Sequence, residues 1–446
     1  MRDFLPEDVR RREHVIATIK RVYERYGFEP LETPAVENIE TLLGKYGEEG
    51  NQLIFKILKR GEHEASGQAD LALRYDLTVP LARVVAQYQS KLPRLFKRYQ
   101  IQPVWRADRP ARGRFREFYQ CDVDSLGSTS PVVEAELCAA MSDALTELGF
   151  NDFVIRMNHR QLLTALLSAA GVATVLHNDA LIALDKLDKI GAEGVAGELA
   201  QRGIAPQAGT ALLRIFRSPG AGKRSPGPQE PASDAMNRVA SFVADDEQGR
   251  AALENLRGIM DLAGQTSAAG KVQFDPSLAR GLSYYTGAIM EINVADLAGS
   301  LGGGGRYDNL VGMFLGQNIP ACGFSLGLER ILVVMTERNM FPPTLATTPA
   351  DVMIATFDAA GAAAAMRLAG TLRGTGLRVL VYPDAEKIGK QIKYADSRGI
   401  PFVALLGDDE IRAGTVTVKN LAAQTQATYD QSAAGAAILE ALRQRG

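Results

Sequence analysis

An arginine-rich loop between two strand-like runs is the feature that most constrains how this chain folds. Residues 99–124, YQIQPVWRADRPARGRFREFYQCDVD, contain two β-prone runs around a tip broken by Pro and Gly, which predicts an antiparallel hairpin with a long loop. Five arginines accompany one acid, Asp108, at this tip: Arg106, Arg109, Arg112, Arg114 and Arg116. Because guanidinium groups repel one another, the tip predicts a polyanionic ligand, and a solvated basic loop is the alternative interpretation.

The strand that returns from this tip places hydrogen-bond acceptors on one face. Because side chains alternate between the two faces of a strand, one face carries Phe118, Gln120, Asp122 and Asp124. This acceptor-rich floor adjoins the basic loop. The combination predicts a molecule that carries an ammonium group, bound beside a triphosphate.

Composition limits the remaining possibilities. A chain of 446 residues has room for roughly two to four domains, and its net charge of −2 means that any nucleic-acid surface is local. The three cysteines and four histidines lack metal-ligand spacing, which argues against a zinc site, a disulfide framework and a His-based metal site. The chain has no charged-then-apolar leader and no apolar run of about 18 residues, so we expect a cytoplasmic protein without a membrane span.

Periodicity predicts the elements of the first 160 residues. Helical spacing is found at 6–26, 79–90 and 132–148, and strand patterns at 53–59, 72–78 and 153–157. In the strand predicted at 72–78, Arg74, Asp76 and Thr78 share a face, whereas the alternative is that Asp76 or Thr78 caps the following helix. The Pro-interrupted segment 27–38 suits a sheet edge or a subunit interface.

The rest of the chain divides by pattern. Residues from about 161 to 265 show helical periodicity, interrupted at 218–231 by a Pro/Gly/Ser-rich stretch that predicts a linker. A helical block between β-rich segments predicts an insertion within a domain that spans 1–341. A Pro/Thr-rich linker at 342–349 then leads to regular strand–helix alternation over 350–446, which predicts a separate module.

Three motifs carry candidate chemistry, each with a plain alternative. The four glycines at 302–305 fit neither a P-loop nor a dinucleotide fingerprint, and they either let the backbone approach a flat ligand or form a tight turn. Arg280 precedes Tyr284 and Tyr285, and the alternative is a surface arginine beside sheet aromatics. Arg330 either pairs with a core carboxylate or stacks on a ligand base. No Ser/His/Asp elbow or HExxH stretch supports a hydrolase.

Taken together, these motifs resemble the histidyl-tRNA synthetase family over almost the whole chain. GFEPLETPAVEN, the arginine loop closing in FREFYQCDVD, and GFSLGLERI resemble the three class II synthetase signatures in order. LARGLSYYTG and GGGGRYDNLV resemble signatures of the histidine enzyme, and RYDLTVP and IPFVALLGDDEIRAGTVTVKNL also match. The class I stretches HIGH and KMSKS are absent.

The resemblance implies an α+β fold and an activity. It implies a class II catalytic domain, with an antiparallel six-stranded sheet flanked by helices and a helical insertion, followed by an α/β anticodon-binding domain. It implies a homodimer that uses ATP and Mg²⁺ to convert L-histidine to histidyl-adenylate and then transfers histidine to the 3′ end of its tRNA.

The resemblance also implies roles for individual residues. The catalytic positions are Arg106 and Arg280. The histidine-binding positions are Asp76, Leu77, Thr78, Arg106, Gln120, Asp124, Arg280, Tyr284 and Tyr285. The ATP-binding positions are Arg106, Asp108, Arg114 and Arg330, and no protein ligand for the metal is assigned.

The chain departs from the commonest family pattern at three positions. Ser283 stands where the family usually has Asp, and Asp76 and Asp124 stand where many bacterial members have Glu. The rival hypothesis is a non-catalytic paralogue that senses histidine as a regulatory subunit of ATP phosphoribosyltransferase. Such paralogues usually lack the anticodon domain and the ATP-contacting arginines, both of which this chain has.

Overall fold

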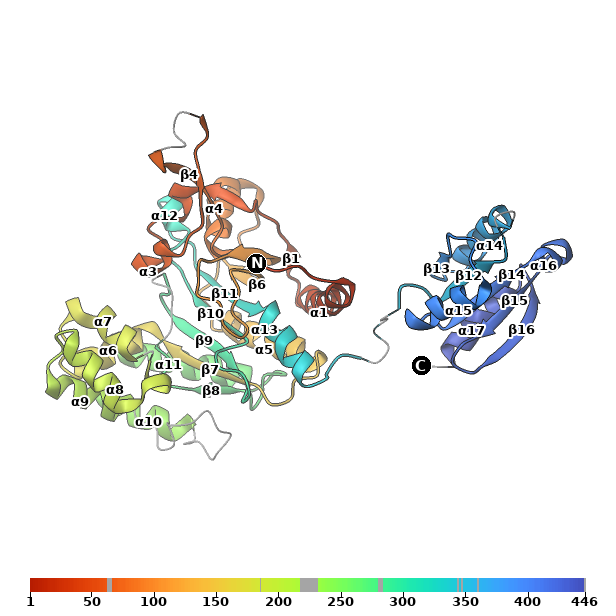
Figure 1. Ribbon diagram of the computed structural model, residues 1–446. Helices are drawn as coiled ribbons and strands as arrows, with labels where there is room; N and C mark the ends of the chain where they lie inside the picture. Colours follow the sequence, from red (N-terminus) through yellow and green to blue (C-terminus); the bar gives the residue numbers. More distant parts are fainter. Residues whose placement is uncertain are drawn as a thin grey trace. The chain divides into compact units, whose positions relative to one another are not determined.

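The computed structural model describes residues 1–61, 66–184, 186–216, 232–279, 284–342, 345, 348–358 and 361–444. They form two compact units, one of Met1–Phe4 and Arg11–Met340, the other of Leu5–Arg10 and Phe341–Gly446 (Figure 1). No helix in the described ranges is long and apolar enough to cross a membrane.

An eight-stranded mixed sheet organises the larger unit. Its strand order is β1 (Glu29–Pro30), β5 (Phe96–Trp105), β6 (Glu117–Leu126), β11 (Ala321–Gly327), β10 (Gly302–Arg306), β9 (Ala288–Asn293), β7 (Val154–His159) and β8 (Val272–Phe274). The six inner strands form the antiparallel set that was expected, and β1 and β8 extend the sheet to eight strands by pairing in parallel at its two edges. Pro30 has no N–H to donate, which suits its place in the edge strand β1.

The predicted arginine hairpin is confirmed as β5 and β6. The two strands pair from Phe96 opposite Leu126 to Trp105 opposite Glu117. The helices that flank the sheet include α1 (Pro6–Arg25), α5 (Val132–Glu147) and α13 (Leu328–Glu337). The apolar stripe of α1 is buried, and the Tyr23 hydroxyl donates to the Cys121 carbonyl of β6 at 3.0 Å, which fixes this helix against the hairpin.

The segment between α1 and β5 corrects one prediction. It contains a three-stranded sheet, β2 (Val36–Asn38), β4 (Ala69–Leu73) and β3 (Lys56–Leu58), with α2 (Ile39–Leu42), α3 (Gly47–Gln52), α4 (Thr78–Tyr88) and the 3₁₀ turn η2 (Gln89–Lys91). The strand predicted at 72–78 ends at Leu73, so Asp76 and Thr78 do not share a strand face. The reason is that the Asp76 carboxylate accepts the Val79 backbone N–H at 3.1 Å, which begins a helix.

Helices fill the region for which helical periodicity was predicted. They are α6 (Arg160–Ala169), the 3₁₀ turn η3 (Thr174–Leu176), α7 (His177–Leu184), α8 (Leu187–Gln201), α9 (Pro206–Phe216), α10 (Ala232–Phe242) and α11 (Glu247–Ala263). Figure 1 shows α6, α7, α8 and α9 gathered to one side of the sheet, whereas α11 packs against α5, β7 and β8. The linker predicted at 218–231 lies outside the described residues. A short helix, α12 (Gly312–Leu315), follows β10.

The smaller unit is a five-stranded α/β module. Its strand order is β13 (Val379–Val381), β12 (Val352–Thr356), β14 (Phe402–Leu406), β15 (Thr415–Asn420) and β16 (Thr425–Asp430), and its helices are α14 (Ala362–Gly374), α15 (Ile388–Ser397), α16 (Asp408–Ala413) and α17 (Ala434–Arg443). The sequence patterns missed β16 because its residues are almost all exposed, so they lack apolar alternation.

Candidate active site

The floor of the candidate site is formed by three neighbouring strands. Strand register aligns Arg98 of β5, Asp124 of β6 and Gly323 of β11 in one row. The next rows are Gln100, Asp122 and Ser325, then Gln102, Gln120 and Gly327. The three β6 side chains of this face are buried, as are Arg98 and Gln100. The acceptor-rich face predicted from alternation is therefore a buried polar surface.

Asp76 lies beside this floor, close to Asp122 and Asp124, with three donors around its carboxylate. The Tyr46 hydroxyl donates to Oδ1 at 3.0 Å, the Tyr284 hydroxyl to Oδ2 at 3.3 Å, and the Val79 backbone N–H to Oδ1. Burial raises the pKa of Asp76, while these donors and the nearby Arg106 guanidinium oppose that rise. Thr78 is close enough to hydrogen-bond with Tyr284. Asp76 is thus a preorganised buried carboxylate.

Asp124 lies in the row of the floor that contains Arg98, and two groups hold its carboxylate. The Tyr307 hydroxyl donates to its Oδ1, and Arg98 Nη2 lies 2.8 Å from its Oδ2. This ion pair is close but poorly aligned for hydrogen bonding, so Asp124 Oδ2 keeps its capacity to accept a hydrogen bond. Burial raises the pKa of Asp124, and Arg98 is the largest opposing influence. Beside it, burial raises the pKa of Asp122 to about 7.

Gln120, in the third row of the floor, has a buried acceptor without a partner among the described residues. Its amide nitrogen donates to the Ser325 hydroxyl at 3.0 Å, whereas its Oε1 has no hydrogen-bond partner within the described residues. The same holds for Asp122 Oδ1. Buried acceptors without partners are costly, so this floor has the chemistry to accept hydrogen bonds from a ligand.

Three tyrosines form an aromatic wall beside the floor. The ring centroids of Tyr284 and Tyr285 lie 5.0 Å apart, and those of Tyr284 and Tyr307 lie 6.0 Å apart. The four glycines at 302–305 belong to β10, so the tight-turn interpretation was wrong. A Cβ on Gly305 would lie 3.0 Å from the Tyr285 ring and 2.5 Å from the Ala288 carbonyl oxygen, so the missing side chain makes room for that ring.

Arg106 connects the floor to the arginine loop. Its Nε donates to the Tyr75 carbonyl at 3.0 Å, and its guanidinium carbon lies 4.2 Å from the centre of the Tyr75 ring and 5.1 Å from that of Phe118. Because Tyr75 directly precedes Asp76, the loop's first arginine lies beside the first acid of the floor. Leu77 is fully buried, and its carbonyl accepts from Arg98 Nη2 at 3.4 Å.

The predicted ATP residues lie around the tip of the loop. Arg114 and Asp108 approach to 3.8 Å, and the Arg114 side chain is half exposed. Arg330 donates to the Ser300 carbonyl at 2.6 Å and to the Gly113 carbonyl at 3.3 Å. Arg330 therefore lies next to the residue that precedes Arg114, and backbone carbonyls accept hydrogen bonds from its guanidinium.

Charge repulsion within the loop is relieved partly from outside it. Arg112 forms a bidentate ion pair with Glu337 of α13 and donates to the Asp296 carbonyl at 3.2 Å. Arg116 donates to the Asp108 carbonyl at 3.3 Å. These contacts hold Arg112 and Arg116 in place, whereas the Arg114 side chain is half exposed to solvent.

Two residues of the sequence hypothesis cannot be placed. Arg280 and Ser283 lie outside the described residues. Within the described ranges, no group of three or more His, Cys, Asp or Glu side chains is arranged to hold a metal ion.

The sequence hypothesis missed Arg98, Tyr46, Tyr307 and Ser325. A signal for Arg98 existed, because Arg98, Gln100 and Gln102 alternate in the first strand and pairing the hairpin places Arg98 opposite Asp124. The contacts of Tyr46 and Tyr307 join segments far apart in the chain, so no local pattern pointed to them.

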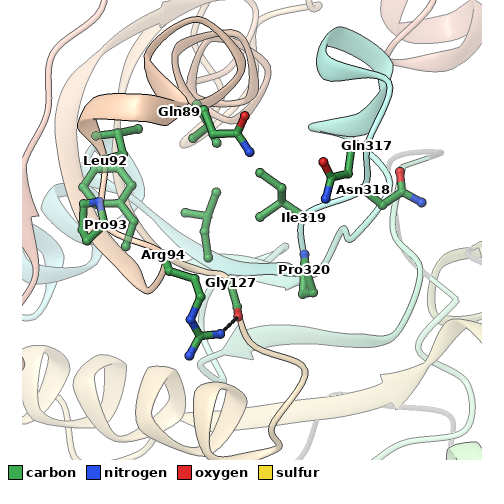
Figure 2. Close-up of a pocket in the computed structure, with 12 residues that line it drawn as sticks. Gln89, Leu92, Pro93, Arg94, Gly127, Gln317, Asn318, Ile319 and Pro320 are labelled. Carbon is green, nitrogen blue, oxygen red and sulfur yellow. Dashed lines mark hydrogen bonds between the residues drawn. The ribbon is translucent and has the colours of Figure 1, made fainter.

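A separate pocket lies at the other end of the hairpin (Figure 2). It has a volume of about 260 Å³ and lies where β5 begins and β6 ends, at Phe96 and Leu126, with Arg94, Gln317 and Ile319 also lining it. None of the described site residues lines it. Its lining is mostly apolar and amide, so it lacks the charge pattern of the candidate site.

Comparisons with known proteins agree with the geometry. The family profile "Histidyl-tRNA synthetase" matches residues 1–331 and the profile "Anticodon binding domain" matches residues 351–441. A histidine–tRNA ligase of Flavobacterium johnsoniae is 40% identical over 466 aligned residues, which cover 96% of each chain. The crystal structure of histidyl-tRNA synthetase from Nostoc sp. PCC 7120 superposes with a TM-score of 0.79 at 30% identity and covers 98% of this chain and 97% of its own.

A third comparison shows the fold alone. The structure titled as an ATP phosphoribosyltransferase regulatory subunit/histidyl-tRNA synthetase from Bacillus halodurans superposes with a TM-score of 0.71 at 22% identity, covering 91% of this chain and 95% of its own.

Proposed function

Because this chain belongs to the histidyl-tRNA synthetase family, we propose that it is a histidine–tRNA ligase with its active site on the β5–β6–β11 floor. The observation that carries this proposal is the juxtaposition of Asp76 and Arg106, joined through the Tyr75 carbonyl. An acid that binds an ammonium group next to a guanidinium that binds a phosphate is what joining an amino acid to ATP requires.

Histidine is held through both of its ends. Asp76, Thr78 and the free Oε1 of Gln120 accept hydrogen bonds from the ammonium group. Asp124 and Tyr285 bind the two imidazole nitrogens, with Tyr284 and the backbone at Leu77 forming the wall. A site that hydrogen-bonds both nitrogens rejects apolar isosteres by about 10⁴-fold, because they leave buried polar groups unpaired.

Activation needs positioning and charge neutralisation. A histidine carboxylate oxygen attacks the α-phosphorus of ATP, the bond to the bridging oxygen breaks, and pyrophosphate leaves with that electron pair. Arg106 bridges the carboxylate and the α-phosphate, and Arg280 supplies a second positive charge there. Arg114 with Asp108 positions the γ-phosphate, and Arg330 covers the adenine.

Mg²⁺ accompanies ATP in this scheme. When bound, the ion would neutralise negative charge on the phosphates of ATP, and no protein ligand is assigned to it. In the second half-reaction, the terminal ribose hydroxyl of tRNA attacks the adenylate carbonyl and AMP leaves.

The residues 351–441 match an anticodon-binding domain, and we assign anticodon recognition to them. The active form proposed is a homodimer in the cytoplasm, where its tRNA is used. The regulatory-paralogue alternative is less well supported, because relatives at 40% identity over 96% of the chain are ligases and the anticodon-domain match is present.

The test is histidine-dependent exchange of labelled pyrophosphate into ATP, followed by charging of histidine tRNA. Purified protein with Mg²⁺ should catalyse both reactions, and Arg106→Ala should reduce exchange by about 100-fold or more. Absence of exchange by correctly folded wild-type protein would exclude the ligase and favour the regulatory paralogue.

A further inference from the structure

Arg98 is a fully buried arginine inside the polar floor. Its side chain has no solvent exposure, and it lies on β5 directly opposite Asp124. We propose that Arg98 is the positioning residue that sets the specificity of this site for imidazole, an inference that rests on the proposed histidine-binding role. It acts through Asp124 and the Leu77 backbone and does not itself contact substrate.

The contacts of Arg98 span both halves of the candidate site. Its Nη2 lies 2.8 Å from Asp124 Oδ2, 3.9 Å from Asp122 Oδ2 and 3.4 Å from the Leu77 carbonyl oxygen. Leu77 lies between Asp76 and Thr78, the proposed ammonium ligands. One guanidinium thus sets the spacing between the ammonium end and the imidazole end of the site.

The same contacts restrict the orientation of Asp124. Oδ1 accepts from Tyr307 and lies where a Cβ on Gly323 would come within 1.8 Å, so glycine leaves just enough room for this rotamer. The Arg98 guanidinium attracts the other carboxylate oxygen, Oδ2. With both oxygens constrained, the remaining lone pairs of Asp124 point in a defined direction, which a planar N–H donor such as imidazole can meet.

Charge gives Arg98 a second effect on Asp124. Arg98 is the guanidinium that pairs with both Asp122 and Asp124, two neighbouring buried carboxylates. Without it, burial and mutual repulsion raise the pKa of both carboxyls further, so that Asp124 as well as Asp122 takes up a proton. A protonated Asp124 loses acceptor capacity toward imidazole, and affinity falls even where the backbone does not move.

The test compares Arg98→Met and Arg98→Lys with Arg74→Lys. Arg74 is a matched control because it is equally buried in the same unit but donates to the Pro103 carbonyl at 2.8 Å and the Thr33 carbonyl at 2.6 Å. Its contact with the floor is to Gln102 Oε1 at 2.9 Å, and Gln102 has no assigned role in ligand binding. Each protein is assayed for the KM of histidine and of ATP in pyrophosphate exchange. Histidinol binding is measured by calorimetry, because histidinol retains the imidazole and ammonium but has no carboxylate to activate.

Arg98→Met should raise the histidine KM and the histidinol Kd by about 10- to 100-fold, the loss expected for one charge-assisted hydrogen bond, with the ATP KM within about twofold of wild type. Arg98→Lys keeps the positive charge but lacks the planar guanidinium, so it should recover part of the lost histidine affinity. Arg74→Lys should lower the thermal midpoint without a selective change in histidine KM. If Arg98→Met does not fold, the double variant Arg98→Met/Asp122→Asn, which balances the charge, replaces it.

The outcomes separate the two hypotheses. Wild-type protein that binds histidinol but lacks exchange refutes the ligase function, and the histidinol Kd of the Arg98 variants still tests the positioning role. Wild-type protein that neither exchanges nor binds histidinol refutes both. With an active wild type, unchanged histidine KM in the Arg98 variants, or equal rises in histidine and ATP KM, overturns the inference.

Discussion

Replacing Gly323 by alanine should selectively damage histidine recognition. An added Cβ would lie 1.8 Å from Asp124 Oδ1, 2.6 Å from Asp124 Cγ and 3.1 Å from the Val123 carbonyl oxygen. The strand backbone is held on both sides by β6 and β10, so the Asp124 carboxylate is the group that must move.

The size of the effect follows from that clash. Oδ1 must retreat by about 1.7 Å to reach a normal separation of about 3.5 Å. A movement of that size breaks the hydrogen bond from Tyr307 and turns the carboxylate away from the ligand. We therefore expect the histidine KM to rise by about 10- to 100-fold and overpacking to cost about 1–3 kcal/mol of unfolding free energy.

The assay is pyrophosphate exchange with histidine and ATP varied in turn, together with a calorimetric unfolding scan. Gly258→Ala is the matched control, since Gly258 lies within α11 and a Cβ there meets nothing within 4 Å. That change should leave both KM values unaltered and stabilise the helix by up to about 1 kcal/mol. A folded Gly323→Ala protein with wild-type histidine KM would show that Asp124 is not at the histidine site.

Three further predictions concern stability and tRNA. Arg306→Leu should cost about 3–5 kcal/mol, measured by urea unfolding, because it strands the buried Glu134 carboxylate that Arg306 binds at 2.6 and 2.9 Å; a loss below about 1 kcal/mol would contradict the burial argument. Burial raises the pKa of Asp122 to about 7, so the folded state holds a proton that the unfolded chain releases near pH 4, and this group's contribution makes stability fall as pH rises between about 4 and 7. Asp122→Asn should flatten that part of the stability profile, and an unchanged slope would reject the assignment. Binding of histidine tRNA should weaken steeply between about 50 and 200 mM salt in a filter-binding titration, since phosphate contacts release counterions, whereas a flat response would argue against a basic docking surface.

Much of the fold could be predicted because it is encoded by local periodicity. The helix at the N-terminus, the arginine hairpin, the helical region and the alternating C-terminal module all have repeating apolar positions that bury one face. The errors arose where that signal is weak or overridden. Asp76 caps a helix where a strand was expected, and β16 has no apolar alternation because it is almost wholly exposed.

The candidate site shows the same division. Alternation along one strand was enough to place Gln120, Asp122 and Asp124 on a common face, and the arginine spacing identified the loop beside them. The partners of those residues could not be identified in that way. Arg98 reaches Asp124 across a strand pair, and Tyr307 reaches it from beyond β10.

The sequence by itself determined which residue types face one another within a hairpin, because neighbouring residues on a strand have a fixed geometry. Only the tertiary structure decided that Asp76, Tyr284 and Tyr307 meet around that hairpin, and that the four glycines form a strand which makes room for Tyr285. The physical reason is that these contacts depend on the order β6, β11, β10 and β9 in the sheet, where distant segments become neighbours through packing of the whole unit.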